Sequence, residues 1–247
     1  MSNMLKNFYG TSHMGYKRNR NEDRYLIKLL QDDRAILLGV ADGMGGEPGG
    51  DISAQIVMDI LQQYQPPAKT TEKGLADILE KAGKKIRRRA QEKTELEGMG
   101  TTATLAFVTN GTAYWAHVGD SRLYLYRDGE LTQITSDHVF IQELIDDGTL
   151  SRSDAERHPL RNMLDQCVGC MDMIPDSGRF AFLPGDKLLL CSDGLTRQVS
   201  NDKIKAVLEN DNARTVSEQL VKKALEAGGS DNITVVVLIN NAILGRG

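Results

Sequence analysis

The amino-acid sequence predicts an α+β layered domain built on antiparallel sheets. Runs of β-prone residues are followed by runs with helical periodicity, without the regular strand-helix-strand alternation of a parallel α/β protein. In the strand-rich middle of the chain, Asn110-Gly111 and Asp128-Gly129 separate neighbouring β-prone segments, and such dipeptides favour two-residue hairpins. The 247 residues contain no obvious linker, so we expect a single domain spanning residues 1–247.

The helices are predicted from apolar stripes and from helix breakers. Residues 51–64 place isoleucines on one helical face at four-residue spacing, and Pro66-Pro67 ends this segment. A second amphipathic stretch begins at Gly74. Near the C-terminus, Thr215-Val216-Ser217-Glu218 has the spacing of a capping box at the start of a helix.

The strands are predicted from β-branched and aromatic runs bounded by turn residues. Segment 233–239 is almost continuously apolar, which indicates a central strand buried on both faces. Residues 136–176 have short amphipathic pieces punctuated by glycine and proline, which indicates an excursion from the main sheet. In chain order, the predicted elements are strands 25–30 and 35–41, helices 51–64 and 74–91, strands 101–109, 112–118, 122–127, 130–135 and 183–191, helices 201–209 and 215–227, and strand 233–239.

Composition and charge exclude several classes of protein. With a net charge of −4, a nucleic-acid-binding surface is not expected. No apolar run approaches the ~20 residues that span a bilayer, and the N-terminus lacks a signal-peptide pattern, so we expect neither a membrane protein nor export. Three cysteines argue against a disulfide framework and for a reducing, cytoplasmic location. The basic run 84–89 is interpreted as a solvated helix face, with a docking surface for acidic partners as the alternative.

Four acidic motifs lie beside predicted strands at widely separated positions. They contribute Asp23, Asp42, Asp193 and Asp231. If the last three converge, each pair of carboxylates at ~4 Å repels by roughly 4 kcal/mol at an effective dielectric of ~20. Protons or divalent cations must neutralise such a cluster. The pattern therefore predicts an all-oxygen site for hard cations such as Mg²⁺ or Mn²⁺.

The glycine-rich loop after Asp42 has a competing interpretation as a dinucleotide-binding turn. Pro48 stands where that motif requires glycine, and Asp42 would repel a bare phosphate at the mouth of the loop. With cations present, Asp42 can bridge two of them and the Gly43 carbonyl can supply a further oxygen. Arg18, four residues before Glu22, adds a bidentate fork that suits a phosphate oxyanion.

Six motifs, in this order along the chain, resemble the signature of the metal-dependent protein phosphatase 2C family, in its bacterial form. The resemblance extends from about residue 15 to 238, and the order of all six motifs makes it specific. The motifs are Arg18 with Asn21-Glu22-Asp23, Val40-Ala41-Asp42-Gly43-Met44-Gly45-Gly46, Gly98-Met99-Gly100-Thr101-Thr102, His117-Val118-Gly119-Asp120-Ser121-Arg122, Cys191-Ser192-Asp193-Gly194-Leu195-Thr196 and Gly228-Gly229-Ser230-Asp231-Asn232-Ile233-Thr234.

The resemblance implies a four-layer α-β-β-α sandwich with two antiparallel sheets and a flap subdomain at about residues 136–176. It implies a binuclear Mn²⁺ or Mg²⁺ centre at one end of the sandwich. Asp42 would bridge the two metals, the Gly43 carbonyl would bind one, and Asp193 and Asp231 would bind the other. Glu22 and Asp23 would hold metal-bound waters, and Asp120 with Asp193 would bind a third, weaker ion. Arg18 would bind the substrate phosphate.

The same resemblance implies a protein serine/threonine phosphatase that uses in-line attack by a metal-bridging hydroxide. Its substrates would be phosphorylated proteins, and it would oppose a bacterial Ser/Thr protein kinase as a monomer. Asp137, His158 and Arg161 would belong to the flap beside the cleft. Met44 stands where eukaryotic members carry a histidine proposed as the general acid.

Three alternatives stay open at the level of sequence. Cys191 and Arg197 have the C-x5-R spacing of cysteine-dependent phosphatases, although Asp193 inside that loop would repel a phosphate dianion. Cys167 and Cys170 form a lone C-x2-C, interpreted as two free thiols, with a redox switch as the lesser alternative. The chain could also be a non-catalytic phosphoprotein-binding scaffold, although Asp42, Asp193 and Asp231 are all present.

Overall fold

Two antiparallel five-stranded sheets form the centre of the molecule. The computed structural model describes residues 7–30, 34–44, 49–66, 72–146, 148–151, 154, 158–160 and 163–241. One sheet has the strand order β1-β10-β9-β6-β7 and the other β2-β3-β4-β5-β8, and every pairing is antiparallel. The strands are β1 (Asn7–His13), β2 (Arg24–Leu30), β3 (Ala35–Ala41), β4 (Ala103–Thr109), β5 (Thr112–Val118), β6 (Arg122–Arg127), β7 (Glu130–Gln133), β8 (Asp176–Ala181), β9 (Lys187–Cys191) and β10 (Ile233–Ile239).

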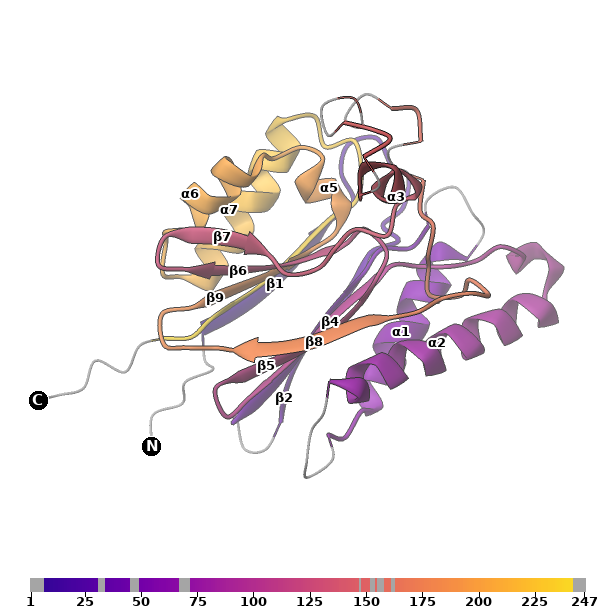
Figure 1. The fold of residues 1–247 in the computed structure, drawn as a ribbon, viewed down its shortest axis with the longest axis horizontal. Coiled ribbons are helices and arrows are strands. Elements are labelled where there is room, and N and C mark those ends of the chain that lie inside the picture. Colours follow the sequence, from indigo (N-terminus) through magenta and orange to yellow (C-terminus); the bar gives the residue numbers. More distant parts are fainter. Residues whose placement is uncertain are drawn as a thin grey trace, which may run out of the picture.

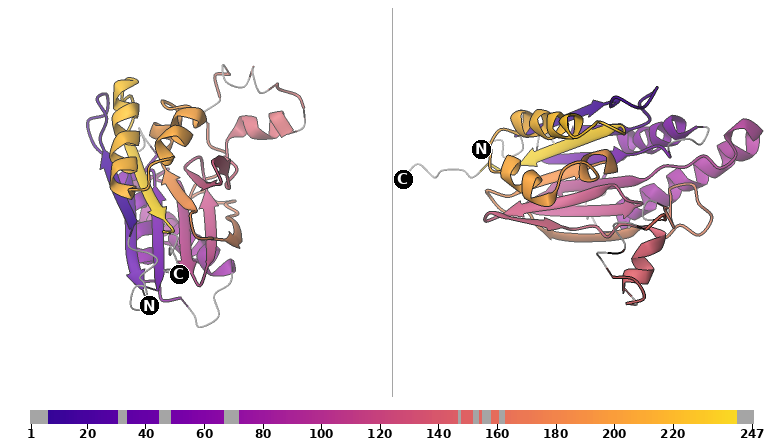
Figure 2. Two further views of the ribbon diagram at one scale, coloured as in Figure 1. Left: turned by 90° about the vertical axis from the view of Figure 1, so that its left-hand side faces the viewer. Right: turned by 90° about the horizontal axis from the view of Figure 1, so that it is seen from above.

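Helices cover the outer face of each sheet (Figure 1). α1 and α2 lie on the sheet that contains β3, and α5, α6 and α7 lie on the sheet that contains β10. α3 lies between β7 and β8 in the chain and projects away from the sheets (Figure 2). The helices are α1 (Gly50–Gln63), α2 (Lys73–Glu92), the 3-10 turn η1 (Thr94–Leu96), α3 (Phe140–Asp146), α5 (Asp193–Thr196), α6 (Asn201–Leu208) and α7 (Ala213–Glu226).

Three layers of buried apolar side chains explain why inner strands such as β3 and β10 are apolar throughout. In β3, Ala35 and Leu37 pack toward α1 and α2, while Ile36 and Leu38 pack toward the opposite sheet. A strand covered on both faces has no polar face, so the usual alternation disappears. The arrangement is helix on sheet, sheet on sheet and sheet on helix. This confirms the predicted four-layer α-β-β-α sandwich.

Most sequence-predicted elements lie where they were expected. Asn110 and Gly111 have φ values of 49° and 70°, and Asp128 and Gly129 have values of 51° and 78°. These positive angles form the two-residue hairpin turns expected from their sequences. β10 is buried along its whole length and lies between β1 and β9, inside its sheet. The basic run 84–89 lies within α2, and four of its five cationic residues are exposed, as the solvated-face interpretation predicts.

Several boundaries differ from the prediction for identifiable reasons. The capping box at Thr215 is wrong: α7 begins at Ala213, and its N-cap is Asn212, whose side chain accepts a hydrogen bond from the Thr215 amide (2.9 Å). The strand predicted over 183–191 starts only at Lys187. The edge strands β1 and β8 were not predicted, because neither has an apolar alternation.

The register brings the ends of several strands to one end of the sandwich. Arg24 at the start of β2 pairs with Ala41 at the end of β3. In the other sheet, Cys191 at the end of β9 pairs with Arg122 at the start of β6 and with Val235 near the start of β10. The acidic motifs directly precede or follow these ends. Antiparallel pairing therefore places together residues that are far apart in the chain.

Candidate metal centre

The acidic motifs converge on one pocket of about 360 Å³ between the two sheets' ends. The pocket is lined by carboxylates, by two arginines that pair with them and by apolar side chains, two of them from the flap. A larger hollow of about 600 Å³ lies between α1 and α2, but none of these converging carboxylates lines it. The described lining residues of the smaller pocket are Arg18, Asp42, Met44, Thr102, Asp120, Met163, Leu164, Asp193, Arg197 and Asp231.

Hydrogen bonds of its backbone hold Asp42 at the end of β3. Its amide donates to the Thr102 hydroxyl (3.1 Å), and its carbonyl accepts from the Thr102 amide (2.9 Å) and the Thr101 hydroxyl (2.8 Å). The Thr102 hydroxyl also contacts that of Ser121 (2.7 Å). With the backbone fixed on both sides, the Asp42 side chain is free to face the pocket.

The other carboxylates are anchored across the two sheets. Ser192, which precedes α5, donates its hydroxyl to one oxygen of Asp23 (2.8 Å), joining the end of β9 to the start of β2. Asn232 accepts from the Glu22 amide (2.9 Å) and donates to the carbonyls of Met14 (2.8 Å) and Arg20 (3.0 Å). These bonds fix the positions of Asp23 and of the loop that carries Asp231.

The crowded carboxylates hold protons far more tightly than isolated ones. Burial, followed by the charges of Asp23 and Asp193, raises the pKa of Asp42 well above its ordinary value. Burial also raises the pKa of Asp23 to about 6 and that of Asp193 to about 6. Burial and the charge of Asp193 raise the pKa of Asp120 to about 7. The cluster is thus short of positive charge in the absence of a cation.

Two buried carboxylate oxygens indicate that the cluster lacks positive charge. Asp23 Oδ1 and Asp193 Oδ1 have no hydrogen-bond partner, although such buried acceptors are almost always satisfied in folded proteins. No three of the described His, Cys, Asp and Glu side chains form a ready-made metal site. Hard divalent cations bind a few carboxylates and otherwise water. The unsatisfied oxygens and the all-oxygen donor set fit such ions.

Two arginines supply the positive charge around these carboxylates. Arg18 forms a bidentate pair with Asp231, with Nε 2.8 Å from Oδ1 and Nη2 2.8 Å from Oδ2. Arg197 contacts a carboxylate oxygen of Asp193, and its Nη2 lies 3.1 Å from Asp120 Oδ2. The Arg18 side chain is 37% exposed, so it also faces solvent at the pocket.

The sequence of the chain matches a known family over nearly its full length. A family model described as protein phosphatase 2C matches residues 9–227. The chain belongs to this family. The matched range contains five of the six motifs that the sequence analysis identified, and the sixth begins directly after it. The pocket is lined by residues from all six motifs.

Relatives within the family have catalytic domains of the same fold. The chain is 37% identical over 223 residues to the serine/threonine protein phosphatase PstP of Mycobacterium tuberculosis, covering 87% of this chain and 43% of that protein, so it spans less than half the length of this relative. It is 35% identical over 235 residues to the protein phosphatase PhpP of Streptococcus pneumoniae, covering 92% of this chain and 95% of that protein. A crystal structure of the PstP catalytic domain in complex with two manganese ions matches with a TM-score of 0.84 and 32% identity, covering 96% of this chain and 99% of that one.

The remaining predicted site residues have varied positions. Glu22 is buried, and burial followed by the charge of Asp51 raises its pKa, but it does not line the pocket. Gly43 packs against the start of α1, where an added Cβ would lie 2.5 Å from the Gly50 carbonyl. Asp120 lines the pocket from the β5–β6 connection. The ligand roles assigned to these residues stay predictions.

Of the three predicted flap residues, the two that the structure describes, Asp137 and His158, do not line the pocket. Asp137 forms an ion pair with Arg122 at the start of β6 (2.6 Å). His158 accepts a hydrogen bond from the Leu160 amide (3.2 Å). Arg161 lies outside the described residues. The flap contributes Met163 and Leu164 instead, two apolar side chains that no sequence motif singled out.

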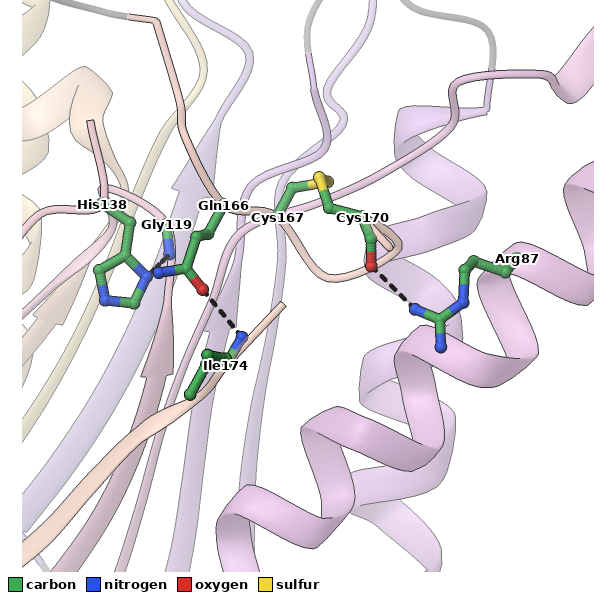
Figure 3. Close-up of a disulfide and its surroundings, with 7 residues drawn as sticks. All are labelled: Arg87, Gly119, His138, Gln166, Cys167, Cys170 and Ile174. Carbon is green, nitrogen blue, oxygen red and sulfur yellow. Dashed lines mark hydrogen bonds between the residues drawn. A yellow bond between two sulfur atoms is a disulfide. The ribbon is translucent and has the colours of Figure 1, made fainter. Parts of the chain in front are cut away.

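The prediction of two free thiols at Cys167 and Cys170 is wrong. The two residues form a disulfide (Figure 3). A turn at Gly169, which has a φ of 125°, brings their Cα atoms to 5.2 Å. Arg87 of α2 donates to the Cys170 carbonyl (2.9 Å), and Val168 forms a β-bridge to Thr101 beside Asp42. The disulfide loop therefore packs directly behind the strand end that carries Asp42.

The third cysteine does not act as a nucleophile. Cys191 is fully buried in β9, and burial raises its pKa to about 12. A thiol with this pKa stays protonated at neutral pH. Its side chain packs among apolar residues beneath α5 and α7, which excludes the cysteine-dependent phosphatase hypothesis.

The raised carboxyl pKa values predict how the metal-free protein responds to pH. In the unfolded chain, Asp23, Asp120 and Asp193 return to ordinary values near 3.8, so the folded chain binds more protons. Their contribution to stability is complete below pH 3.8 and is lost as the pH rises through about 6 to 7. Each proton that differs between the states changes the free energy of unfolding by about 1.4 kcal/mol per pH unit.

Urea unfolding in EDTA at about pH 5.5 and about pH 8 checks this prediction. We expect a lower midpoint at the higher pH, and a smaller difference for Asp193→Asn. Burial lowers the pKa of His117 to about 3, so this residue makes the folded protein more stable as the pH rises toward 6.5. Between pH 5.5 and 8, the loss of stability from the three carboxyls together is larger than this gain. A midpoint independent of pH in EDTA would contradict the assigned carboxyl pKa values.

Proposed function

We propose that this protein is a metal-dependent protein serine/threonine phosphatase with a binuclear Mn²⁺ or Mg²⁺ centre. One observation carries the proposal: Asp42, Asp193 and Asp231 come from distant strand ends and line one pocket. Ser192 joins Asp23 to the same end of the sheets, and Asp23 and Asp193 each have a buried carboxylate oxygen without a hydrogen-bond partner. Membership of the protein phosphatase 2C family and the manganese ions of the PstP structure support the same conclusion.

The chain's own residues can be assigned to steps of phosphoester hydrolysis. Asp42, with Asp193 and Asp231, would hold the cations, and Asp23 would anchor their coordinating waters. When bound, these ions would lower the pKa of an attacking water and offset charge on the phosphoryl oxygens. Arg18 would bind and orient the substrate phosphate for in-line attack. Among the described lining residues no histidine is present, so the pocket offers no imidazole as a general acid.

The pocket's outer wall suits phosphorylated side chains of proteins. Met163 and Leu164 of the flap form an apolar rim beside the charged floor, and Met163 is 54% exposed. Such a rim can pack against the residues that flank a phosphoserine or phosphothreonine.

We further propose that the chain works as one catalytic domain and as a monomer, and that it opposes a bacterial Ser/Thr kinase. Among the described residues, no helix is long and apolar enough to cross a bilayer; the expected cytoplasmic location stays a prediction.

Hydrolysis of p-nitrophenyl phosphate and of a phosphothreonine peptide, each with and without Mn²⁺, tests this function. We expect turnover of both with Mn²⁺ and none in EDTA. The alternative of a non-catalytic scaffold predicts that the peptide binds but is not hydrolysed at any Mn²⁺ concentration. Absence of turnover with saturating Mn²⁺ would favour that alternative.

Replacing Arg18 with alanine is expected to raise KM for the phosphopeptide much more than it lowers kcat. The guanidinium lies at the pocket and can exchange its bonds to Asp231 for bonds to a phosphate oxygen. Loss of a charge-assisted hydrogen bond of about 1.5–3 kcal/mol corresponds to a roughly tenfold to hundredfold effect. Arg20→Ala is the matched control, because Arg20 is exposed and does not line the pocket. A KM for Arg18→Ala equal to that of the control would exclude phosphate binding by Arg18.

A further inference from the structure

Arg197 lies where the sequence predicts a third, weaker metal ion. It follows α5 directly, four residues after Asp193, so its side chain folds back over the first turn of that helix. Its amide donates to the Asp193 carbonyl (2.9 Å), which fixes its backbone. Its guanidinium then bridges the carboxylates of Asp193 and Asp120, the same two residues that were expected to bind the third ion.

The two carboxylates need a positive charge and Arg197 supplies it. Asp120 and Asp193 are each only 7% exposed, and two buried like charges side by side are unfavourable unless a cation neutralises them. Among the described residues, Arg197 is the ion-pair partner of both. The other arginine of the pocket, Arg18, directs both of these bonds to Asp231.

The guanidinium and a metal ion would compete for the same oxygens. Arg197 is permanently charged, since a guanidinium does not lose its proton in proteins, and it would repel a cation that approached Asp120. Its side chain is only 35% exposed, and its backbone is bonded to that of Asp193. A third ion could bind only after this side chain had moved away.

We propose that Arg197 acts as a built-in cation for the Asp120–Asp193 pair and closes this position to a metal ion. The pocket then takes two exchangeable cations, at Asp42, Asp193 and Asp231, and not three. Arg197 is thus a positioning residue: it holds Asp193 in place for one of these two ions and stands in for the third. This inference rests on the proposed binuclear centre.

Counting bound Mn²⁺ tests the inference directly. With the full chain, the EPR signal of free Mn²⁺ measures how many ions each chain removes from solution. We expect the wild type to saturate at two ions and to bind no third at Mn²⁺ concentrations up to several millimolar. We expect three for Arg197→Gln, with the additional ion bound at a Kd on the order of 1 mM, as for a site of few carboxylates completed by water.

Two further variants separate charge from other effects of the substitution. Arg197→Lys keeps the positive charge within reach of Asp193 and is expected to bind two ions. Arg88→Gln removes an arginine that forms the same kind of i,i+4 pair, with Glu92, on the exposed face of α2, and it is also expected to bind two. In EDTA at pH 8, we expect Arg197→Gln to melt at a lower temperature than Arg88→Gln, because two buried carboxylates lose their partner.

The outcomes separate this inference from the proposed function. Three ions bound by the wild type, or two by a folded Arg197→Gln, would overturn the role of Arg197 while leaving a metal-dependent phosphatase intact. If the wild type bound no Mn²⁺ and showed no Mn²⁺-dependent turnover, the proposed function itself would fail, and the inference with it. Should Arg197→Gln not fold, the wild-type count and Arg197→Lys still decide the question.

Discussion

Asp42→Ala is expected to lower turnover of a phosphothreonine peptide about a thousandfold, since a lost cation site removes several kcal/mol of transition-state stabilisation. Asp42 lies at the end of β3, and the charges of Asp23 and Asp193 raise its pKa more than those of any other residues. It lines the pocket together with Asp193 and Asp231, and we expect it to bridge the two cations there. Without it, neither cation would retain its ligands.

The same substitution is not expected to unfold the protein. It removes a buried charge that its neighbours repel, so the metal-free variant should be at least as stable as the wild type at pH 8. Steady-state kinetics with saturating Mn²⁺ and urea unfolding in EDTA measure the two effects separately. Asp202→Ala, an exposed aspartate in the first turn of α6, is the control and should keep wild-type turnover. Wild-type turnover by folded Asp42→Ala would refute its role.

Gly194→Ala is expected to destabilise the protein by about 3 kcal/mol and to weaken Mn²⁺ binding. Gly194 is the second residue of α5, and an added Cβ would lie 1.9 Å from the Asn232 carbonyl oxygen. This oxygen belongs to the backbone just before β10, so it cannot rotate aside. The start of α5 would have to move away from the loop that carries Asp231, which would separate Asp193 from Asp231.

Gly83→Ala is the matched control for this steric effect. Gly83 also lies in a helix, α2, but there the nearest atoms to an added Cβ are the flexible ends of Met173 (3.3 Å) and Arg87 (3.4 Å). Alanine also has a higher helix propensity than glycine, so the free energy of unfolding of Gly83→Ala should lie within about 1 kcal/mol of the wild-type value. Urea unfolding of both variants measures the difference. Equal urea midpoints for the two variants would show that α5 can shift without loss of stability. The close contact of Gly194 with the Asn232 carbonyl would then not hold Asp193 and Asp231 in place.

The sequence predicted those features that depend on local chemistry. The hairpins at Asn110-Gly111 and Asp128-Gly129 follow from two residues that tolerate positive φ, and both have it. The convergence of Asp42, Asp193 and Asp231 was posed as a condition by the residues themselves and was implied by the resemblance to the phosphatase 2C signature. Each lies beside a strand, and the antiparallel register carries them to the same end of the sandwich.

What the sequence could not predict depends on contacts between distant segments. β1 is a half-buried edge strand with Gly10 in its middle, and only the structure shows the Tyr25 ring that occupies the space of a Cβ there, 2.5 Å from it. The bridge from Arg197 to Asp120 joins residues 77 positions apart, and its one local signal was the four-residue spacing from Asp193. The Cys167–Cys170 disulfide depends on the backbone turn at Gly169, which could not be predicted from the sequence.

Exhaustive removal of metal followed by its stepwise return tests the central claim most directly. The protein is dialysed against EDTA, and hydrolysis of a phosphothreonine peptide is followed while Mn²⁺ is added back and the bound ions are counted. We predict no hydrolysis at the start and full recovery when two ions are bound per chain. Undiminished hydrolysis after EDTA, or recovery without stoichiometric Mn²⁺ binding, would contradict a catalytic centre formed by cations between these aspartates.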